Sequence, residues 1–224
     1  MPGRTRPLEF ISRRIEPAAC LSAPTPQVPR PRIQGLSDLI FGLALSIGAL
    51  QFVGNPPADA GTLTADLAEF AFTFLVLINV WNRYTSTTSV MPVETPLMIR
   101  LNMLLLFLVA IEPFLFGVLF VPGVSTATGA AASLYYSLDV GGMNLILAYF
   151  THLLASEEKN LIPKELMRRY REIRNVLVLG GAIFLVSAIP FFWDIVYAGI
   201  PLRIYFWLAT LPVLWIPRVV RRFV

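Results

Sequence analysis

The feature that most constrains this chain is a series of long, nearly uncharged apolar blocks. Six such blocks hold 17 to 25 residues each, and a helix needs about 20 residues to cross the hydrocarbon core of a bilayer. Strands of a membrane barrel would instead show alternating segments of about ten residues. The continuous blocks therefore predict an all-α integral membrane protein with six transmembrane helices, because a helix satisfies its own backbone groups in lipid. The predicted spans are Gly35–Gly54, Leu63–Trp81, Leu101–Val121, Ala130–Leu154, Val176–Ala198 and Pro201–Pro217.

The composition excludes several classes of function. Hydrophobic residues make up 56% of the chain and charged residues 14%, whereas soluble domains carry about 25% charged residues. A soluble enzyme and a nucleic-acid-binding module are therefore excluded, and the lipid bilayer is the expected surrounding. The single cysteine, Cys20, and the single histidine, His152, argue against a disulfide framework and a Cys- or His-rich metal site. The sequence also lacks nucleotide-binding, nucleophile-elbow and zinc motifs, so we expect neither enzyme activity nor a cofactor.

The basic residues predict the orientation in the membrane. Seventeen of the 18 Lys and Arg residues fall in the N-terminal arm, in the connections after spans two and four, and at the C-terminus, which leaves only Arg203 on the other side. Because cytoplasmic segments carry the excess of Lys and Arg, both termini are expected in the cytoplasm and the protein in the cell membrane. Residues 1–31, rich in Pro and Arg, are predicted to be a disordered cytoplasmic arm, and residues 32–224 to form one six-helix channel-like domain.

Two connections carry specific expectations. The charged segment Ser156–Asn175 alternates Glu with Arg and Lys, which favours a solvated helical extension of span five. Only Ala198-Gly199-Ile200-Pro201 separates spans five and six, which predicts a tight helical hairpin. Pro190 is expected inside span five, where neighbouring helices could satisfy the freed backbone groups.

Span one has an unusual distribution of side chains. One helical face carries apolar residues and one hydroxyl at steps of four, three and four: Leu39, Leu43, Ser46 and Leu50. A second face carries small residues at steps of seven, which let a neighbouring helix approach closely: Gly35, Gly42 and Ala49. This combination favours a helix that lines a narrow pore. The alternative is a central bundle helix with ordinary leucine packing.

Four carboxylates fall inside or at the edges of the spans. An aspartate at the centre of a membrane helix costs about 2.5–3.5 kcal/mol on insertion scales, so each such residue is a functional hypothesis. Glu112 and Asp139 lie near mid-membrane and Asp38 in the first turn of span one. They could handle protons or cations, or they could be hydrogen-bonded structural groups. For Glu69, nearer the outer edge of span two, snorkelling is the simpler interpretation.

Several motifs occur together in a recognisable order. The segment Arg32-Ile-Gln-Gly-Leu-Ser-Asp38 resembles the R-x-x-x-F-S-D signature that opens the first helix of the transmembrane protein 175 family of potassium channels. Span two ends in Phe74-Leu-Val-Leu-Ile-Asn-Val-Trp81, similar to the family's helix closing on W-x-x-H. Leu101-Asn102 through Pro113-Phe114 and the pair Leu134-Tyr135 also resemble family positions. The sequence departs from the family pattern at Leu36, in place of Phe, and at Tyr84, in place of His.

The resemblance implies a potassium-leaning cation channel without a classical filter, with proton permeability as an open possibility. It implies a homotetramer in which four copies of span one line the pore. Leu43 would then form the hydrophobic constriction, Ser46 a ring of hydroxyls and Leu50 a further apolar ring, on the same face as Leu39. The implied network at the cytoplasmic end of the pore consists of Arg32, Ser37, Asp38, Trp81 and Tyr84.

Two other functions stay open at this stage. A secondary transporter could use Glu112 and Asp139 as proton-coupled sites, although transporters usually show internal repeats and broken helices. A non-conducting membrane scaffold or assembly subunit is the other alternative.

Overall fold

The computed structural model describes residues 32–54, 56–91, 95–121, 123–156, 162–197 and 200–220. The chain divides into two units, residues 1–31 and 32–224, and the predicted disordered arm lies outside the described residues. The second unit contains, in order, α1 (Arg32–Gly54), α2 (Ala60–Thr88), α3 (Pro96–Phe120), α4 (Thr126–Ala155), α5 (Lys164–Ser187), α6 (Phe191–Asp194), β1 (Val196–Tyr197), β2 (Ile200–Pro201) and α7 (Leu202–Val220).

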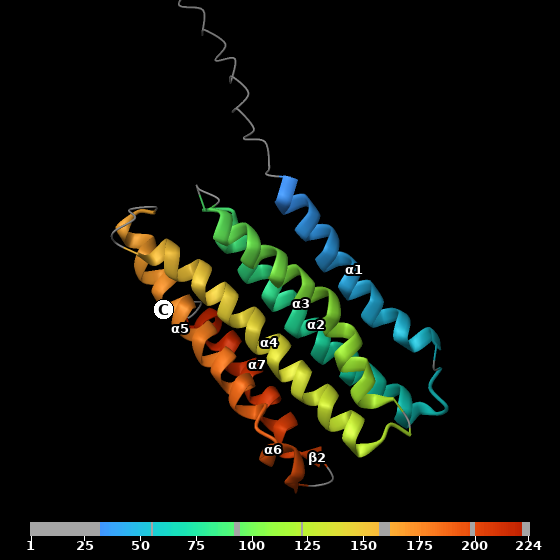
Figure 1. Ribbon diagram of the computed structural model, residues 1–224. Helices are drawn as coiled ribbons and strands as arrows, with labels where there is room; N and C mark the ends of the chain where they lie inside the picture. Colours follow the sequence, from blue (N-terminus) through green and yellow to red (C-terminus); the bar gives the residue numbers. More distant parts are fainter. Residues whose placement is uncertain are drawn as a thin grey trace, which may run out of the picture. The chain divides into compact units, whose positions relative to one another are not determined.

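The long helices of this unit run side by side, with α1 and α5 near opposite edges (Figure 1). Helix α1 packs on α2 and α3, α3 packs on α4, and α4 packs on α5, which also contacts α7. We call the end that holds the starts of α1, α3 and α5 the terminal end. The opposite end, with the antiparallel β1–β2 pair, is called the hairpin end.

Side-chain caps fix the starts of three helices. Asp59 caps α2, and its carboxylate accepts a hydrogen bond from the Thr62 backbone N–H at 2.8 Å. The Asp59 backbone N–H in turn donates to the Thr62 hydroxyl oxygen. Thr95 caps α3, with Pro96 in the first turn, and Ser125 caps α4. These residue types satisfy the backbone N–H groups that the first turn leaves unpaired.

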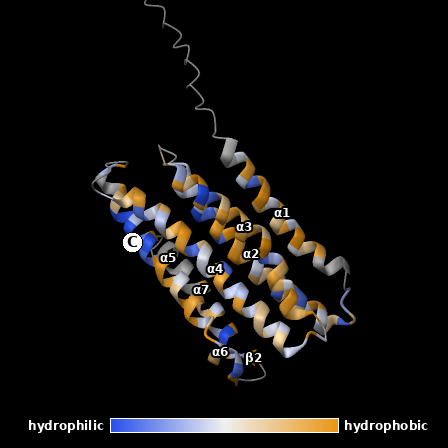
Figure 2. Ribbon diagram, in the orientation of Figure 1, coloured by the Kyte–Doolittle hydropathy of each residue, from blue (hydrophilic) through white to orange (hydrophobic). Residues whose placement is uncertain are grey.

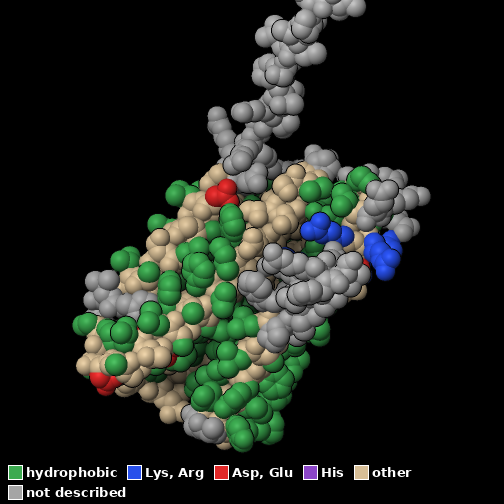
Figure 3. Space-filling model, turned by 180° about the vertical axis from the view of Figure 1, so that it is seen from behind, with side chains coloured by type: hydrophobic (Ala, Val, Ile, Leu, Met, Phe, Trp, Pro, Cys, Tyr) green, Lys and Arg blue, Asp and Glu red, His purple; other side chains and the backbone are tan. Residues whose placement is uncertain are grey.

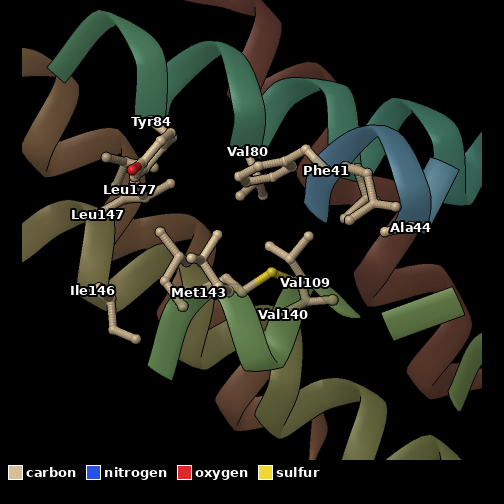
Figure 4. Close-up of a cluster of buried hydrophobic side chains, with 14 of the residues drawn as sticks. Phe41, Ala44, Val80, Tyr84, Val109, Val140, Met143, Ile146, Leu147 and Leu177 are labelled. Atoms are coloured by element: carbon tan, nitrogen blue, oxygen red, sulfur yellow. The ribbon is translucent and has the colours of Figure 1, made fainter. Parts of the chain in front are cut away.

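Side chains from α1, α2, α3, α4, α5 and α7 form the buried core. Figure 4 shows Phe41 of α1 beside Tyr84 of α2, with residues of α3, α4 and α5 facing them. The ring centroids of Phe41 and Tyr84 are 5.7 Å apart. Since lipid is as apolar as these side chains, close packing rather than the hydrophobic effect holds such helices together.

Helices α4 and α5 approach each other at two glycines. A Cβ atom built on Gly141 would lie 2.9 Å from Cδ2 of Leu185, and one on Gly181 would lie 3.3 Å from the Gly141 carbonyl oxygen. A larger residue at Gly141 would push the helices apart. This contact is of the small-residue type common between membrane helices.

The surface supports the predicted membrane protein. Among the described residues, α2, α3 and α4 are each long and apolar enough to cross a membrane, and shorter apolar stretches cover 35–50 and 202–211. Apolar residues run along the helices in Figure 2, and hydrophobic side chains cover much of the face in Figure 3. The prediction of an all-α membrane protein is confirmed, whereas the count of six spans stays a prediction.

The predicted geometry of spans five and six is wrong. Helix α5 begins at Lys164, which agrees with the expected helical extension, but it ends at Ser187 instead of continuing to Ala198. Pro190 lies beyond the helix, because a proline removes a backbone N–H and clashes with the preceding turn. The connection holds α6 and the two short strands rather than a tight helical hairpin. Ala198 and Gly199 lie outside the described residues.

Candidate functional site

Helix α1 divides sharply into a packed face and an exposed face. Its packed face, Ser37, Phe41, Ala44 and Gly48, is buried. On the other side, Leu39, Leu43 and Leu50 are between 59% and 66% exposed, and Ser46 is exposed beside them. The structure thus places all four sequence-predicted pore residues on one uncovered side of the chain.

The one hydroxyl on this exposed face is held by its own helix. Ser46 Oγ donates to the Gly42 carbonyl oxygen at 2.8 Å. A hydroxyl oxygen has two acceptor lone pairs, so this bond leaves the oxygen able to face a cation. The exposed face therefore offers the apolar side chains of Leu39, Leu43 and Leu50 together with the Ser46 hydroxyl.

Hydrogen bonds join α1 to α2 at the terminal end. The Ser37 and Tyr84 hydroxyls are 2.7 Å apart in the buried interface. Trp81 Nε1 donates to Asp38 Oδ1 at 3.1 Å. Trp81 and Tyr84 are three residues apart on one helix and therefore face the same neighbour. Four of the five predicted network residues lie together in this way, and the side chain of Arg32 lies outside the described part of the structure.

The departures from the family signature have clear local environments. Tyr84 fills a buried position and supplies the hydroxyl that meets Ser37. Leu36 is 44% exposed on α1, so the replacement of an aromatic ring there leaves the packed face of the helix intact. Arg83, counted in the sequence as part of a connection, is buried inside α2.

Glu112 lies in the interior between α2, α3 and α4. It is fully buried, and its Oε1 accepts hydrogen bonds from Thr73 Oγ1 at 2.6 Å and from the Tyr136 hydroxyl at 3.2 Å. Among the described residues, Glu112 Oε2 has no hydrogen-bond partner. Helix α3 continues through Pro113 as far as Phe120.

Asp139 is the second buried carboxyl group. It follows Tyr136 by three residues on α4, is 3% exposed, and finds no hydrogen-bond partner for either oxygen within the described ranges. Tyr136 therefore connects the neighbourhoods of the two acids. The sequence singled out Glu112 and Asp139 but missed the hydroxyl donors Thr73 and Tyr136.

A cavity of about 590 Å³ opens near these acids at the hairpin end. Asp66 and Glu69 of α2 line it, and so do Thr73 and Phe116. Phe116 in turn packs against the Tyr136 ring at a centroid distance of 5.3 Å. Two residues of the cavity wall therefore adjoin this site, because Thr73 bonds Glu112 itself and Phe116 packs against Tyr136, the second donor to Glu112.

A separate polar cluster ties α4, α5 and α7 together. Trp207 Nε1 donates to Ser137 Oγ at 3.2 Å and to Ser187 Oγ at 3.0 Å. Arg203 donates to Ser133 Oγ and to the carbonyl oxygens of Ala188 and Ile189, the two residues that follow α5. These contacts explain how a buried arginine is tolerated at this end of the unit.

Histidine and the acids show no arrangement typical of metal binding. His152 Nδ1 lies 3.2 Å from Arg174 Nη1 at the terminal end. Within the described residues, no group of three or more His, Cys, Asp or Glu side chains could hold a metal ion.

A family model described as the endosomal/lysosomal potassium channel TMEM175 matches residues 32–113. The matched segment is similar to this family. It comprises α1, α2 and α3 up to Pro113, and therefore includes the exposed face of α1, the terminal-end network and Glu112. The predicted resemblance to the family is confirmed.

Solved structures of TMEM175 proteins share the fold. A variant of the potassium channel MtTMEM175, crystallised with a nanobody fusion protein, is similar with a TM-score of 0.59 and 15% identity over 86% of this chain and 94% of that one. A TMEM175 homologue from Chamaesiphon minutus, described as a lysosomal potassium-selective channel, has a TM-score of 0.50 and 17% identity over 80% of this chain and 96% of its own. No curated protein gives a significant match.

Proposed function

We propose that the chain is one subunit of a potassium-conducting cation channel whose pore is lined by α1. The observation that carries this proposal is the coincidence of the TMEM175 match over residues 32–113 with an α1 that leaves Leu39, Leu43 and Leu50 uncovered in the single chain.

Four copies of the chain around an axis would turn this exposed face inward. Leu43 would form the narrowest apolar ring and Leu50 a second one, with the Ser46 hydroxyls between them. Hydrophobic constrictions close pores by losing water, and they conduct when they become wet. Such rings would gate the pore without a filter of backbone carbonyls.

The terminal-end network would hold α1 in the correct rotation about its axis. The Ser37–Tyr84 and Trp81–Asp38 contacts both fall on the α2 side of α1. Because they fix that side, the leucine face keeps its direction. We include Arg32 in this network from the sequence alone.

The proposed orientation places the terminal end in the cytoplasm of a cell carrying the protein in its cell membrane. Arg100, Arg168, Arg169, Arg171 and Arg174 all lie toward this end, near the starts of α3 and α5. The excess of positive charge follows the positive-inside pattern. An epitope placed at either terminus should not be accessible to antibody from outside intact cells, and this result would agree with the proposed orientation.

A buried carboxyl pair favours a second candidate, a proton-coupled transporter. Glu112 and Asp139 are interior acids near a cavity, the arrangement that proton relays use. This candidate requires slow, saturable ion movement coupled to proton flux. A channel instead passes ions in discrete current steps.

Reconstitution separates these functions. Purified protein in planar bilayers, with potassium and sodium gradients imposed in turn, should give single-channel steps that reverse near the potassium equilibrium potential. Saturable flux without steps would support the transporter, and electrical silence from a correctly assembled protein would support a scaffold. Protein-free bilayers made from the same detergent stock provide the control.

A further inference from the structure

We propose that Glu112 and Asp139 form a proton-binding site inside each subunit, reached from the cavity at the hairpin end and coupled to α1 through Thr73. Proton binding itself is independent of the proposed channel function. Only the coupling to α1 rests on that function.

The cavity supplies the route. It is lined by Asp66 and Glu69 near the hairpin end and by Thr73 deeper inside. Thr73, one of the lining residues, donates its hydroxyl hydrogen to Glu112 Oε1 at 2.6 Å. One residue therefore stands between the cavity and the buried acid, and its hydroxyl both donates and accepts hydrogen bonds.

The buried oxygens lacking partners point to a proton as the ligand. In the described structure, Glu112 Oε2 and both oxygens of Asp139 are without hydrogen-bond partners. An isolated carboxylate in an apolar interior is very costly, so the group is neutralised instead. Thr73 and Tyr136 both donate hydrogen bonds to Glu112 Oε1. A metal site would need that oxygen to offer its lone pairs to the ion. The arrangement instead suits a carboxyl group that gains or loses a proton at Oε2.

The surrounding helices contribute few other charges. On α4, Tyr136 contacts Glu112 and Asp139 follows one turn later. On α2, Asp66 and Glu69 line the cavity. On α7, Arg203 donates to Ser133 and to the carbonyl oxygens of Ala188 and Ile189. Helix α5 presents the neutral Ser187 to this side of α4. Helix α6 contributes Asp194, which lies near Arg203.

Thr73 also lies beside the proposed pore helix. A Cβ atom built on Gly48 of α1 would lie 3.8 Å from the Thr73 methyl carbon. Gly48 lies between Ser46 and Leu50 along α1, on its packed side. A change in the Thr73–Glu112 hydrogen bond would therefore alter the packing of α1 next to Ser46 and Leu50, two of its proposed pore residues.

The step is a simple proton transfer. A hydronium ion in the cavity gives its proton to the Glu112–Asp139 pair, leaving water, and the pair loses one negative charge. Release returns the proton to cavity water. The presence of two acids near Tyr136 allows one proton to be shared, because like charges in a buried site disfavour double ionisation.

Infrared difference spectroscopy tests the binding without using conduction. Purified protein in lipid should show a protonated-carboxyl C=O stretching band at mildly acidic pH that is lost at mildly alkaline pH. Glu112→Gln should remove or strongly reduce this band. Glu172→Gln, a change of an exposed acid on α5 outside the cavity lining, should retain it. A band that does not respond to pH, or that survives equally in Glu112→Gln and Asp139→Asn, would overturn the proposal.

Thr73→Val provides a second variant that keeps the side-chain volume, in case Glu112→Gln fails to assemble. Loss of the Thr73 donor removes a hydrogen bond that favours the charged carboxyl, so the midpoint of the band should move to higher pH, and Thr73→Ser should restore it. An unchanged midpoint in Thr73→Val would contradict the proposed route.

A side-specific experiment tests the coupling separately. With potassium current recorded in planar bilayers, acidification of the hairpin-end solution alone should change the current, and Glu112→Gln should flatten this response. A normal infrared response with a pH-independent current would refute the coupling but keep the proton site. Absence of any potassium current would refute the proposed function, and the infrared result would still decide the site.

Discussion

Single polar contacts at the terminal end join α1 to α2. Asp38 accepts the indole N–H of Trp81, and Ser37 meets the Tyr84 hydroxyl one position earlier. Both contacts connect the same two helices. A change in either should therefore affect the assembly as well as the subunit.

The Asp38 contact gives the first prediction. Asp38→Ala removes the acceptor of the Trp81 N–H, which should lower stability by about 1 kcal/mol and shift the detergent-solubilised protein toward smaller oligomers. Size-exclusion chromatography with light scattering, together with thermal denaturation, measures both effects. Asp38→Asn is the matched control, because its side-chain oxygen can still accept. Equal behaviour of the two variants would contradict the role of this hydrogen bond.

The cap of α2 gives a prediction about pH. Hydrogen bonds from the Thr62 backbone N–H and hydroxyl hold the pKa of Asp59 below its usual value of 3.8. A carboxyl whose pKa is lower in the folded state contributes stability above its unfolded pKa and loses that contribution as pH falls through the folded pKa. Wild-type Tm should therefore fall in this acidic range more steeply than that of Asp59→Asn, which keeps the cap without a titrating group. Parallel Tm curves would contradict this.

Residue type alone predicted the two buried acids of the interior but not the hydroxyl groups beside them. Glu112 and Asp139 were identifiable because acids in apolar spans are costly. Thr73 was not, since threonine hydroxyls in helices often bond to carbonyls of the preceding turn, as Thr151 does with Leu147. Tyr136 was not, because a local pattern does not show which helix a tyrosine hydroxyl will meet. Only the packing of α2 against α3 and α4 shows that Thr73 donates across helices instead.

At the scale of elements, apolar length predicted α1 to α4 well and α5 poorly. Three of the first four predicted spans lie within observed helices, and the other, Leu101–Val121, runs one residue past the end of α3. The sequence stays apolar through Pro190, so hydropathy did not indicate where the helix ends. Helix α5 ends at Ser187, because Pro190 lacks the backbone N–H that would continue it. Arg203, fifteen residues beyond Ala188, bonds the carbonyl oxygen of Ala188, and such long-range partners are not visible in a local pattern.

The α4–α5 contact gives a prediction at this scale. Gly141→Ala places a Cβ 2.9 Å from Leu185, and such overpacking should cost about 1–3 kcal/mol. Adding Leu185→Ala should recover part of this loss, because the two positions share one contact. Gly35→Ala, where a Cβ meets no atom within 4 Å, is the control. Thermal denaturation measures the stability of the three variants. A Gly141→Ala variant as stable as wild type would contradict the proposed α4–α5 contact.

At the scale of the whole molecule, the exposed face of α1 is the surface that further copies of the chain are proposed to cover. Its leucine face is uncovered, and its neighbouring surface includes Gly42, where an added Cβ would meet no atom within 4 Å in the single chain. Small residues of this kind allow close helix approach. The sequence predicted this face, but a lone subunit cannot display the neighbours proposed to cover it.

Gly42 therefore distinguishes contacts within a subunit from contacts between subunits. Gly42→Leu should leave helical content unchanged, because the single chain has room for the side chain, and should prevent tetramer formation. Circular dichroism and mass measurement in detergent or nanodiscs test the two parts. Retention of a full tetramer would show that this side of α1 faces lipid.

The most direct test of the proposed pore is the conductance of Leu43→Ala. Four shortened side chains should keep the constriction wet, so basal current should rise and discrimination between potassium and sodium should weaken. Leu179→Ala on α5, an equally large truncation of a leucine that is 51% exposed at the other edge of the subunit, should leave both unchanged. An unaltered current with unaltered ion preference in Leu43→Ala would remove Leu43 from the pore and contradict the account.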